Sequence, residues 1–378
     1  MTLVRDAFRH SRNYYLAVLT ELAGPALKAA TRIRCGPPSP PSSWRKGLII
    51  GHTHIGDVLY RTASLSHLAR GLPQCEWSYL CSDESATVLR DRQDLANVLP
   101  LVAGEDSWTL KPGGFEALRS HEFDVALCTN TLRHYPDLLL SVALGIPNRV
   151  GYGYKGLSGL MTSPITFNYP SPFPSYFRTM VSRITDTVAD WDLRPTITLD
   201  ASDVELAENF LAGLGLDGAP VLACCPATRQ PVGAWPHDQM LAAAEIAARS
   251  LGARLVLCGG PADRSMLESL AARATMPCDI LPGTLPLRSF AAFLSRCAIV
   301  LAQDSAPRHL ANAVETPVVF LRNLSVSRVE TGTYCDTELD VAPHDEFVTG
   351  DRLASVVAKT SPAAISESIL RMARARGA

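Results

Sequence analysis

Several features that would place a chain in a common protein class are missing from this sequence of 378 residues. It contains no run of eighteen apolar residues, which excludes a transmembrane helix of ordinary length. Its N-terminus lacks the continuous apolar stretch of a secretory signal peptide, so we do not expect export. The net charge of −2 gives no reason to expect a nucleic-acid partner.

The ten cysteines show neither a disulfide framework nor the spacing of a metal site. There is no C-x-x-C and no Cys/His ligand spacing, so we expect no zinc or iron–sulfur centre and no other metal or cofactor. Several cysteines stand inside apolar, strand-like runs. We therefore expect buried free thiols in a reducing cytosol.

What the chain does have is an alternation of strand-like and helical stretches, which is typical of α/β proteins with doubly wound parallel sheets. In the first half, strands are expected at 47–51, 77–82 and 123–128, and helices at 57–70 and 135–144. In the second half, strands are expected at 220–225, 253–258, 278–281, 297–302 and 317–321, and helices at 202–213, 236–250, 261–273, 287–296 and 306–314. Residues 162–178, rich in proline and aromatic residues, are predicted to form a loop.

This pattern predicts two Rossmann-like domains with extensions at both ends. Residues 1–43 form a basic helical extension (1–36) and a proline-rich linker (37–43), because consecutive prolines propagate neither helix nor central strand. The domains are expected at 44–190 and 191–360, and a last helix at 361–378 could brace the first domain. The basic extension has two interpretations, peripheral contact with an anionic membrane surface or packing on its own domain, and the second is favoured.

The stretch GHTHIGDV at 51–58 is the first that carries chemistry. It follows a strand-like run and opens a helix, which places its side chains at the carboxyl edge of a parallel sheet. Asp57 is the one carboxylate there, and helix capping and catalysis are equally consistent with its position. The turn is neither G-x-G-x-x-G nor a Walker A, so a dehydrogenase or a P-loop enzyme is not expected.

The stretch QDSAPRHLANAVETPVVFL at 303–321 is the second. Ser305 is a plausible N-cap, and the N–H groups of Ala306, Arg308 and His309 are expected to remain open to an anion. Arg308 would add fixed positive charge. An ordinary capped helix explains the segment equally well.

Two further turns follow strand-like runs. Thr228 and Arg229 could bond a phosphate after the run that ends near 225. Gly259 and Gly260 would let the backbone approach a ligand. Asp263 could accept a bond from a ribose hydroxyl or cap the next helix.

Taken together, these stretches resemble glycosyltransferase family 9, the ADP-heptose:lipopolysaccharide heptosyltransferases, over roughly residues 47–321. The family's Ser-x-x-Gly-Asp turn resembles Thr53-His54-Ile55-Gly56-Asp57. Its G-G-P-x-[DE] and D-[ST]-G-P-x-H-L-A segments are similar to 259–263 and 304–311, its P-G-x-x-x…K-x-W-P stretch to 226–236, and its G-x-[ST]-x-L segment to 283–287.

The resemblance implies a GT-B fold, two Rossmann-like domains facing across a cleft. It implies an inverting, metal-independent transfer of a sugar to a hydroxyl of a glycan, glycolipid or natural product, with ADP-heptose as donor. Asp57 would be the general base, and Thr53, His54 and Gly56 would form the acceptor-side turn. The donor would be bound by a set of residues in the second domain: Thr228, Arg229, Gly259, Gly260, Asp263, Asp304, Ser305, Ala306, Arg308 and His309. The enzyme would be cytoplasmic or peripheral at the inner membrane face.

The sequence departs from the family pattern where a positive charge is expected. Gly233 stands where the family commonly has lysine, and Ala306 replaces the usual glycine. We expect Arg308 to restore the missing charge, with Arg229 and Arg322 as alternatives. A non-catalytic nucleotide-sugar-binding or scaffold protein is the alternative function. A sugar-nucleotide epimerase would need an acid/base pair for which the sequence shows no signature.

Overall fold

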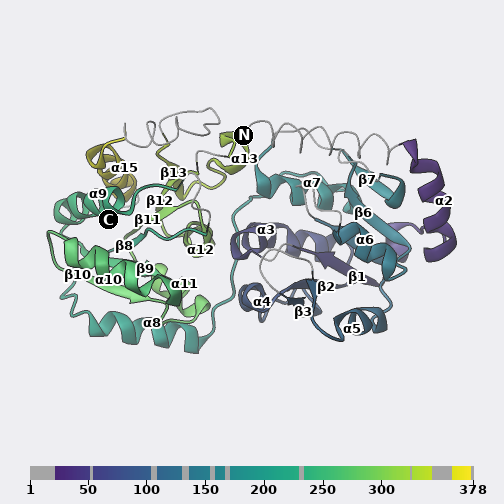
Figure 1. Ribbon diagram of the computed structural model, residues 1–378, viewed down its shortest axis with the longest axis horizontal. Helices are drawn as coiled ribbons and strands as arrows, with labels where there is room; N and C mark the ends of the chain where they lie inside the picture. Colours follow the sequence, from purple (N-terminus) through teal and green to yellow (C-terminus); the bar gives the residue numbers. More distant parts are fainter. Residues whose placement is uncertain are drawn as a thin grey trace, which may run out of the picture. The chain divides into compact units, whose positions relative to one another are not determined.

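The computed structural model describes residues 22–51, 54–103, 109–129, 136–153, 158–166, 171–229, 234–323, 326–342 and 360–375. The chain divides into two compact units (Figure 1). The first consists of Met1–Tyr169 and Ser175–Trp191, and the second of Pro170–Pro174 and Asp192–Ala378. Each unit has its own sheet and its own hydrophobic core.

The first unit is built on a seven-stranded sheet of order β4-β3-β2-β1-β5-β6-β7. Every neighbouring pair is parallel except β3 and β4. The strands are β1 Lys46–Ile50, β2 Glu76–Ser82, β3 Asn97–Ala103, β4 Thr109–Leu110, β5 Val125–Cys128, β6 Asn148–Tyr152 and β7 Ser163–Ile165. The order reverses direction between β1 and β5, which makes the carboxyl end of β1 the switch point where ligands bind in such sheets.

Helices alternate with most of these strands, as the sequence predicts, and α7 follows the last of them. They are α3 Ile55–Gly71, α4 Asp83–Leu89, α5 Gly114–Ser120, α6 Pro136–Ala143 and α7 Phe173–Thr185, with a 3-10 turn η3 Ser158–Leu160 before β7. The side chains of Leu48, Ile49 and Ile50 are fully buried, as expected for a central strand covered on both faces.

The second unit has a six-stranded, fully parallel sheet of order β10-β9-β8-β11-β12-β13. Its strands are β8 Val221–Cys225, β9 Arg254–Gly259, β10 Cys278–Pro282, β11 Ile299–Gln303, β12 Val318–Leu321 and β13 Glu338–Asp340. Its helices are α8 Ala201–Gly213, α9 His237–Leu251, α10 Arg264–Arg273, α11 Leu287–Leu294, α12 Ala306–Ala313, α13 Arg328–Thr331 and α15 Pro362–Ala375, with η4 Pro261–Asp263. Here the switch point lies between β8 and β11.

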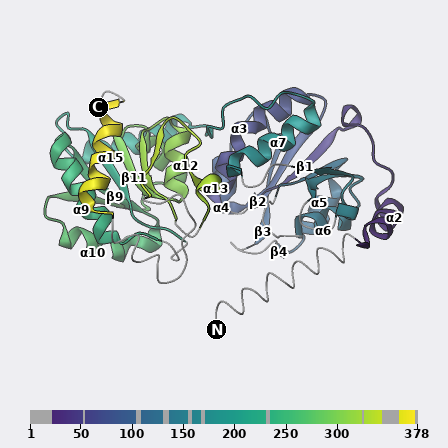
Figure 2. The same ribbon diagram turned by 90° about the horizontal axis from the view of Figure 1, so that it is seen from above.

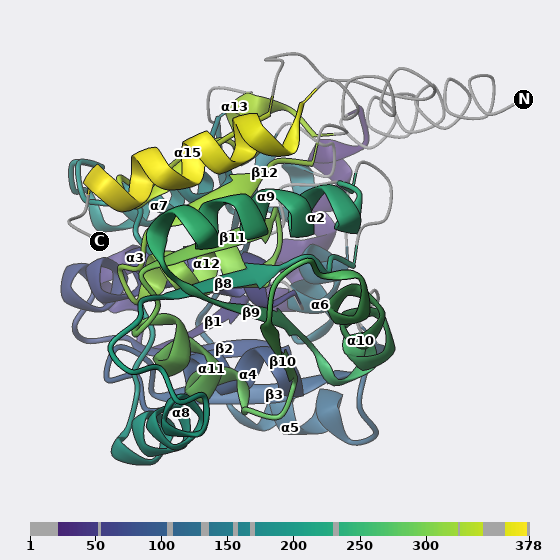
Figure 3. The same ribbon diagram turned by 90° about the vertical axis from the view of Figure 1, so that its left-hand side faces the viewer.

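The last helix, α15, lies along α9 (Figure 3). Ile365 and Ile369 are fully buried in the core of the second unit, so the apolar side of α15 is used there. The sequence also predicts that this helix braces the first domain. That stays a prediction, because the contacts described here lie within the second unit.

The described part of the N-terminal extension forms α2 Gly24–Cys35 and packs on the first unit. Gly24 lies so close to Gly159 that a Cβ on Gly159 would meet the Gly24 carbonyl oxygen at 2.4 Å. Arg34 donates to the carbonyls of Val142 and Ala143 at the end of α6, at 3.0 and 2.9 Å. Of the two interpretations of this segment, packing on its own domain is confirmed for α2.

The prediction of a loop over 162–178 is wrong in two places. Residues 163–165 form the edge strand β7, and α7 begins at Phe173. Pro174 is tolerated because the first turn of a helix has no intrahelical partner for its missing N–H. Met180 and Val181 of this helix are fully buried.

The cysteines agree with the sequence-based expectation of free thiols. All ten are free, and eight of them are buried. Among the described residues no helix has the length and apolar character needed to cross a membrane. Within the same part of the chain, no cluster of three or more His, Cys, Asp or Glu side chains could hold a metal ion.

Candidate active site at two sheet edges

The turn after β1 places Asp57 at the switch point of the first sheet. His54 occupies the N-cap position of α3 without a capping bond from its side chain, and Gly56 and the half-buried Asp57 lie in the first helical turn. Thr53, predicted to lie on the acceptor side, falls outside the described residues, as does His52. Asp57 is thus a first-turn residue of α3 and not its N-cap residue, and its charge is favourably placed near the helix N-terminus.

One carboxylate oxygen of Asp57 is held by a neighbouring phenol. The Tyr60 hydroxyl, one helical turn further on, donates to Asp57 Oδ1 at 2.7 Å. Tyr60 is buried, and burial raises the pKa of its hydroxyl well above the ordinary value. The phenol therefore stays protonated and acts as a fixed donor to the carboxylate.

A buried cation lies next to this pair. Arg61 is 2% exposed and donates to the Asp57 carbonyl at 2.5 Å and to the Thr129 carbonyl at 3.3 Å. Burial alone would lower the pKa of Arg61, but the oxygens of Tyr60, Tyr79 and Asp57 raise it. The Arg61 charge therefore persists beside the main chain of Asp57.

Gly51, the residue after β1, is required by a close approach. A Cβ at this position would lie 2.3 Å from the Tyr79 hydroxyl oxygen, which no side chain could accommodate without displacing the ring. The first glycine of the sequence motif is therefore explained by packing against β2.

The predicted donor residues lie after the carboxyl ends of three neighbouring strands of the second sheet. Thr228 and Arg229 follow β8, residues 259–263 end β9 and form η4, and residues 304–309 follow β11. Because the carboxyl ends of parallel strands share one edge, the fold brings these segments to the same side of the sheet. Arg229 is exposed there, and Asp304, Ser305, Ala306 and His309 are half-buried.

Asp263 has a local partner. Its Oδ2 accepts a hydrogen bond from the Gly260 N–H at 2.8 Å, which closes the glycine turn. Gly283, with φ +65°, lies against the same turn, since a Cβ there would be 2.4 Å from the Pro261 nitrogen. Of the two roles expected for Asp263, first-turn capping is observed at η4, although its side chain makes no capping bond to α10. The bond to a ribose hydroxyl stays a prediction.

Helix α12 starts as predicted, with Ser305 as its N-cap residue, but the Ser305 side chain makes no capping bond. Its hydroxyl instead lies 3.4 Å from the Ala227 carbonyl oxygen, in the loop after β8. The Arg308 N–H bonds the Ser305 carbonyl at 3.1 Å. It is therefore not open to an anion, contrary to the sequence-based prediction.

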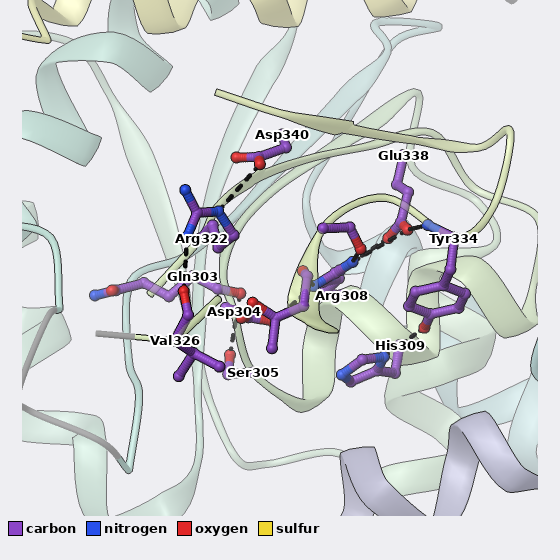
Figure 4. A network of polar contacts seen from close by, with 12 residues as sticks. Gln303, Asp304, Ser305, Arg308, His309, Arg322, Val326, Tyr334, Glu338 and Asp340 are labelled. Atoms are coloured by element: carbon purple, nitrogen blue, oxygen red, sulfur yellow. Dashed lines mark hydrogen bonds and ion pairs between the residues drawn. The ribbon is translucent and has the colours of Figure 1, made fainter. Parts of the chain in front are cut away.

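The guanidinium of Arg308 is enclosed by protein (Figure 4). It donates to Glu338 Oε2 and Oε1 at 2.8 and 3.1 Å, and to Asp304 Oδ1 at 2.7 Å. It also donates to the carbonyls of Thr331 and Gly332, at 2.7 Å each. Arg308 is 1% exposed and stacks 3.5 Å from the centre of the Phe320 ring.

These contacts contradict the expectation that Arg308 supplies charge to a donor phosphate. Its donors are directed at two carboxylates and two carbonyls inside the second unit. Arg322, one of the alternatives, is also buried and pairs with Asp340 at 3.2 Å. Of the three arginines considered, the exposed one is Arg229.

The same network reaches His309. The Tyr334 hydroxyl lies 2.5 Å from His309 Nδ1, and the two rings stack with centroids 5.8 Å apart. Tyr334 is fixed in turn because its backbone N–H donates to Glu338 Oε1 at 2.5 Å. Glu338 on β13 therefore orients both Arg308 and the partner of His309.

Gln303 is a residue that sequence reasoning missed. Its buried amide accepts from the Trp235 N–H at 2.9 Å and donates to the carbonyls of Pro226 and Trp235 at 2.7 and 3.2 Å. One side chain thus bonds residues near both ends of the segment between β8 and α9. The signal available in the sequence was a polar residue at the end of an otherwise apolar strand.

Comparison with known proteins agrees with this architecture. The profile of glycosyltransferase family 9 (heptosyltransferase) matches residues 115–331, more than half of the chain. The protein belongs to glycosyltransferase family 9. It is therefore a glycosyltransferase, and the sequence-based resemblance is confirmed.

Relatives of this family 9 chain are distant in sequence. The lipopolysaccharide core heptosyltransferase OpsX of Haemophilus influenzae is 21% identical over 277 residues, which cover 71% of this chain and 76% of the relative. A family 9 structure from Veillonella parvula covers 89% of this chain and 97% of its own, with a TM-score of 0.71 and 16% identity. The E. coli ADP-heptose lipopolysaccharide heptosyltransferase II gives 0.68 and 17%, covering 88% and 100%. These structures establish the GT-B fold that the sequence predicts.

Proposed function

We propose that this family 9 enzyme transfers a sugar, heptose from ADP-heptose, to a hydroxyl of a glycan, glycolipid or natural product on the cytoplasmic side of the membrane. The reaction is an inverting, metal-independent displacement at the anomeric carbon. Family membership supports sugar transfer. The ADP-heptose donor named for the E. coli structure supports the choice of nucleotide sugar.

The observation that carries this proposal is the setting of Asp57. The carboxylate lies at the switch point of the first sheet, with Oδ1 oriented by the Tyr60 hydroxyl at 2.7 Å. As general base it accepts the proton of the acceptor hydroxyl while the hydroxyl oxygen forms its bond to the anomeric carbon. The bond from that carbon to the diphosphate breaks in the same step, and the diphosphate leaves with the electron pair.

Charge that builds on the leaving diphosphate is stabilised at the edge of the second sheet. The N-terminus of α12 contributes its dipole, and His309 in the first turn contributes an imidazole oriented by Tyr334. Arg229, exposed after β8, provides the fixed positive charge that Arg308 and Arg322 do not.

The first test replaces the base. Asp57→Asn keeps the shape of the side chain but removes the proton acceptor, so transfer is expected to fall about 10²–10⁴-fold. Affinity for ADP, measured by calorimetry in the presence of EDTA, should change little. Turnover near the wild-type rate would refute the assignment of Asp57.

The second test concerns the donor charge. Arg229→Ala should weaken ADP binding about tenfold, because a charge-assisted bond to phosphate is lost. The matched control is Arg296→Ala, since Arg296 pairs with Glu208 in an exposed ion pair outside the predicted donor segments. Equal ADP affinity of the two variants would contradict the role of Arg229.

The same titration of the wild-type protein with UDP and GDP tests the choice of nucleotide. Selective binding of UDP or GDP would change the proposed donor and leave the fold assignment intact.

A non-catalytic nucleotide-sugar-binding protein is the second candidate. The observation that favours it is that Arg308 and Arg322 are both held in buried ion pairs, while Gly233, at the place of the family lysine, lies outside the described residues. Incubation of the wild-type protein with ADP-heptose and a pool of acceptors decides between the two. Released ADP with a glycosylated product excludes the second candidate.

A further inference from the structure

Helix α2 has two faces of different character. Leu27, Thr31 and Cys35 recur at helical spacing, are buried or half-buried, and lie on the side that packs against the first unit. The Cys35 thiol lies 3.7 Å from the Val142 carbonyl oxygen, where it fixes the end of the helix to α6. This side accounts for the attachment of α2 to its own domain.

The opposite face is apolar and exposed. Ala26, Ala29 and Ile33 follow one another at i, i+3 and i+7, and all three are exposed. Ile33 is 89% exposed, and Leu22, just before the helix, is 74% exposed. An isoleucine exposed on this helix, with a leucine exposed just before it, indicates an interaction surface. Figures 1 and 2 show α2, in purple, on the outside of the first unit.

The charges on this helix are all of one sign. Its sequence GPALKAATRIRC contains no acidic residue, and Lys28 and Arg32 are exposed beside the apolar face. Arg5, Arg9 and Arg12 precede it in the sequence, against Asp6 and Glu21. Apolar residues bordered by lysine and arginine, with no acid between them, are complementary to the surface of an anionic lipid bilayer.

We propose that the exposed face of α2 docks on an anionic membrane surface, with Ile33 and Leu22 inserted at the headgroup boundary and Lys28 and Arg32 on lipid phosphates. A second copy of the chain fits this face less well. Pairing α2 with itself would bring Lys28 and Arg32 near their own copies, with no carboxylate on the helix to compensate. The proposal concerns attachment alone and does not depend on which sugar the enzyme transfers.

The test measures binding of the full chain to vesicles in a flotation assay. Vesicles of phosphatidylglycerol and phosphatidylcholine should bind the wild-type protein more tightly than vesicles of phosphatidylcholine alone. Ile33→Gln, a change that an exposed helix tolerates, should lower the affinity about tenfold. The matched control is Val188→Gln, because Val188 is a similarly exposed residue of the first unit, at 77%. That control should bind like the wild type.

The charge contribution is tested with a second matched pair. Arg32→Gln should lower the affinity for the anionic vesicles about fivefold, whereas Arg119→Gln, which removes an exposed arginine from α5, should not. Equal effects of the two members of either pair would overturn the proposal, as would equal binding to neutral vesicles. A dimer in light scattering that Ile33→Gln dissociates would assign the face to a second copy instead. Ile33→Gln and Arg32→Gln should retain activity on a soluble acceptor. Failure of docking and failure of the proposed function therefore remain distinguishable.

Discussion

At the scale of single residues, Asp57 and Arg308 lie in different surroundings at the edges of the two sheets. Asp57 is half-buried, its carboxylate accepts from the Tyr60 phenol, and its backbone carbonyl accepts from the buried guanidinium of Arg61. Arg308 is enclosed by two carboxylates and two carbonyls. The first arrangement leaves the Asp57 carboxylate suited to proton transfer. In the second, the Arg308 charge is paired within the protein and does not serve a ligand.

The Tyr60 hydroxyl is predicted to hold the Asp57 carboxylate in the orientation needed for proton transfer. Tyr60→Phe removes the hydrogen bond to Asp57 Oδ1, so kcat should fall about tenfold because the orientation of the base is lost. Affinity for ADP should stay that of the wild type. The measurements are the transfer rate at saturating donor and acceptor, and calorimetric titration with ADP.

Tyr79→Phe is the control for this prediction. Its buried hydroxyl has no hydrogen-bond partner among the described residues, so its removal takes no bond from Asp57. We expect kcat of this variant to match that of the wild type. A kcat for Tyr60→Phe that also matches the wild type would mean that the hydrogen bond does not orient the base.

The position of Asp57 could be predicted from sequence because a glycine-bracketed turn after a strand is a local pattern. The fate of Arg308 could not. Its main partner, Glu338, is thirty residues further along the chain and reaches it only because β13 lies beside β12 in the sheet. The role of Gln303 could not be predicted for a related reason, because its partners lie in the segment that follows β8.

At the scale of elements, the pair Arg308–Glu338 joins α12 to β13. Both side chains are fully buried, and Glu338 also accepts from Asn312 on the same helix at 2.8 Å. Such a contact fixes the first turn of α12, and with it Asp304 and His309, to the edge strand of the sheet.

Glu338→Gln is predicted to destabilise the second unit by about 3–5 kcal/mol, because it leaves the Arg308 charge buried with weaker compensation. Burial alone would raise the pKa of Glu338, but Arg308 and the Tyr334 N–H hold it below the ordinary value. The stabilisation is therefore complete above about pH 5 and is lost as the pH falls through this lowered pKa.

Urea unfolding between pH 3 and pH 7 measures both effects. Glu208→Gln serves as control, since Glu208 pairs with Arg296 at 2.6 Å but both side chains are about half exposed. Its cost should stay below about 1 kcal/mol. If the two variants are equally stable, Glu338 contributes no more than a surface pair.

At the scale of elements, helices and strands could be predicted where the hydrophobic periodicity was clear. The predictions were wrong where the composition suggested a loop. The prolines and aromatic residues of 162–178 suggested a loop, yet Tyr176, Met180 and Ile184 follow a helical spacing and are all buried in α7. The short edge strand β13 was missed, because three residues carry too little pattern to predict a strand.

At the scale of the whole molecule, the alternation of strands and helices was enough to predict two domains with doubly wound sheets, and the resemblance to the family added the GT-B fold. The order of strands within each sheet could not be derived from that alternation, because it depends on which apolar surfaces meet after the chain folds. The five motifs in family order identified the family, but neither they nor the periodicity predicted the strand order.

Burial of the thiols gives a prediction for the whole chain. Burial raises the pKa of Cys128, Cys224, Cys258 and Cys297 well above that of a free thiol, so these groups stay protonated and unreactive. In the native protein a thiol reagent should react quickly with at most Cys278 and Cys335, the two half-buried cysteines.

Titration with a chromogenic disulfide before and after addition of guanidinium is the measurement. All ten cysteines should react in the unfolded chain, since all are free. Rapid reaction of more than two thiols in the native state would show that one of the cores opens readily.

The enclosed pair of Arg308 and Glu338 also has a consequence for how this chain can evolve. Loss of either partner alone leaves the other charge buried and uncompensated, whereas loss of both at once can be nearly neutral. Substitutions at these two positions are therefore expected to occur together. Homologues with an uncharged residue at the place of Arg308 should have no acid at the place of Glu338, and the first turn of α12 should then be fixed by apolar contacts instead.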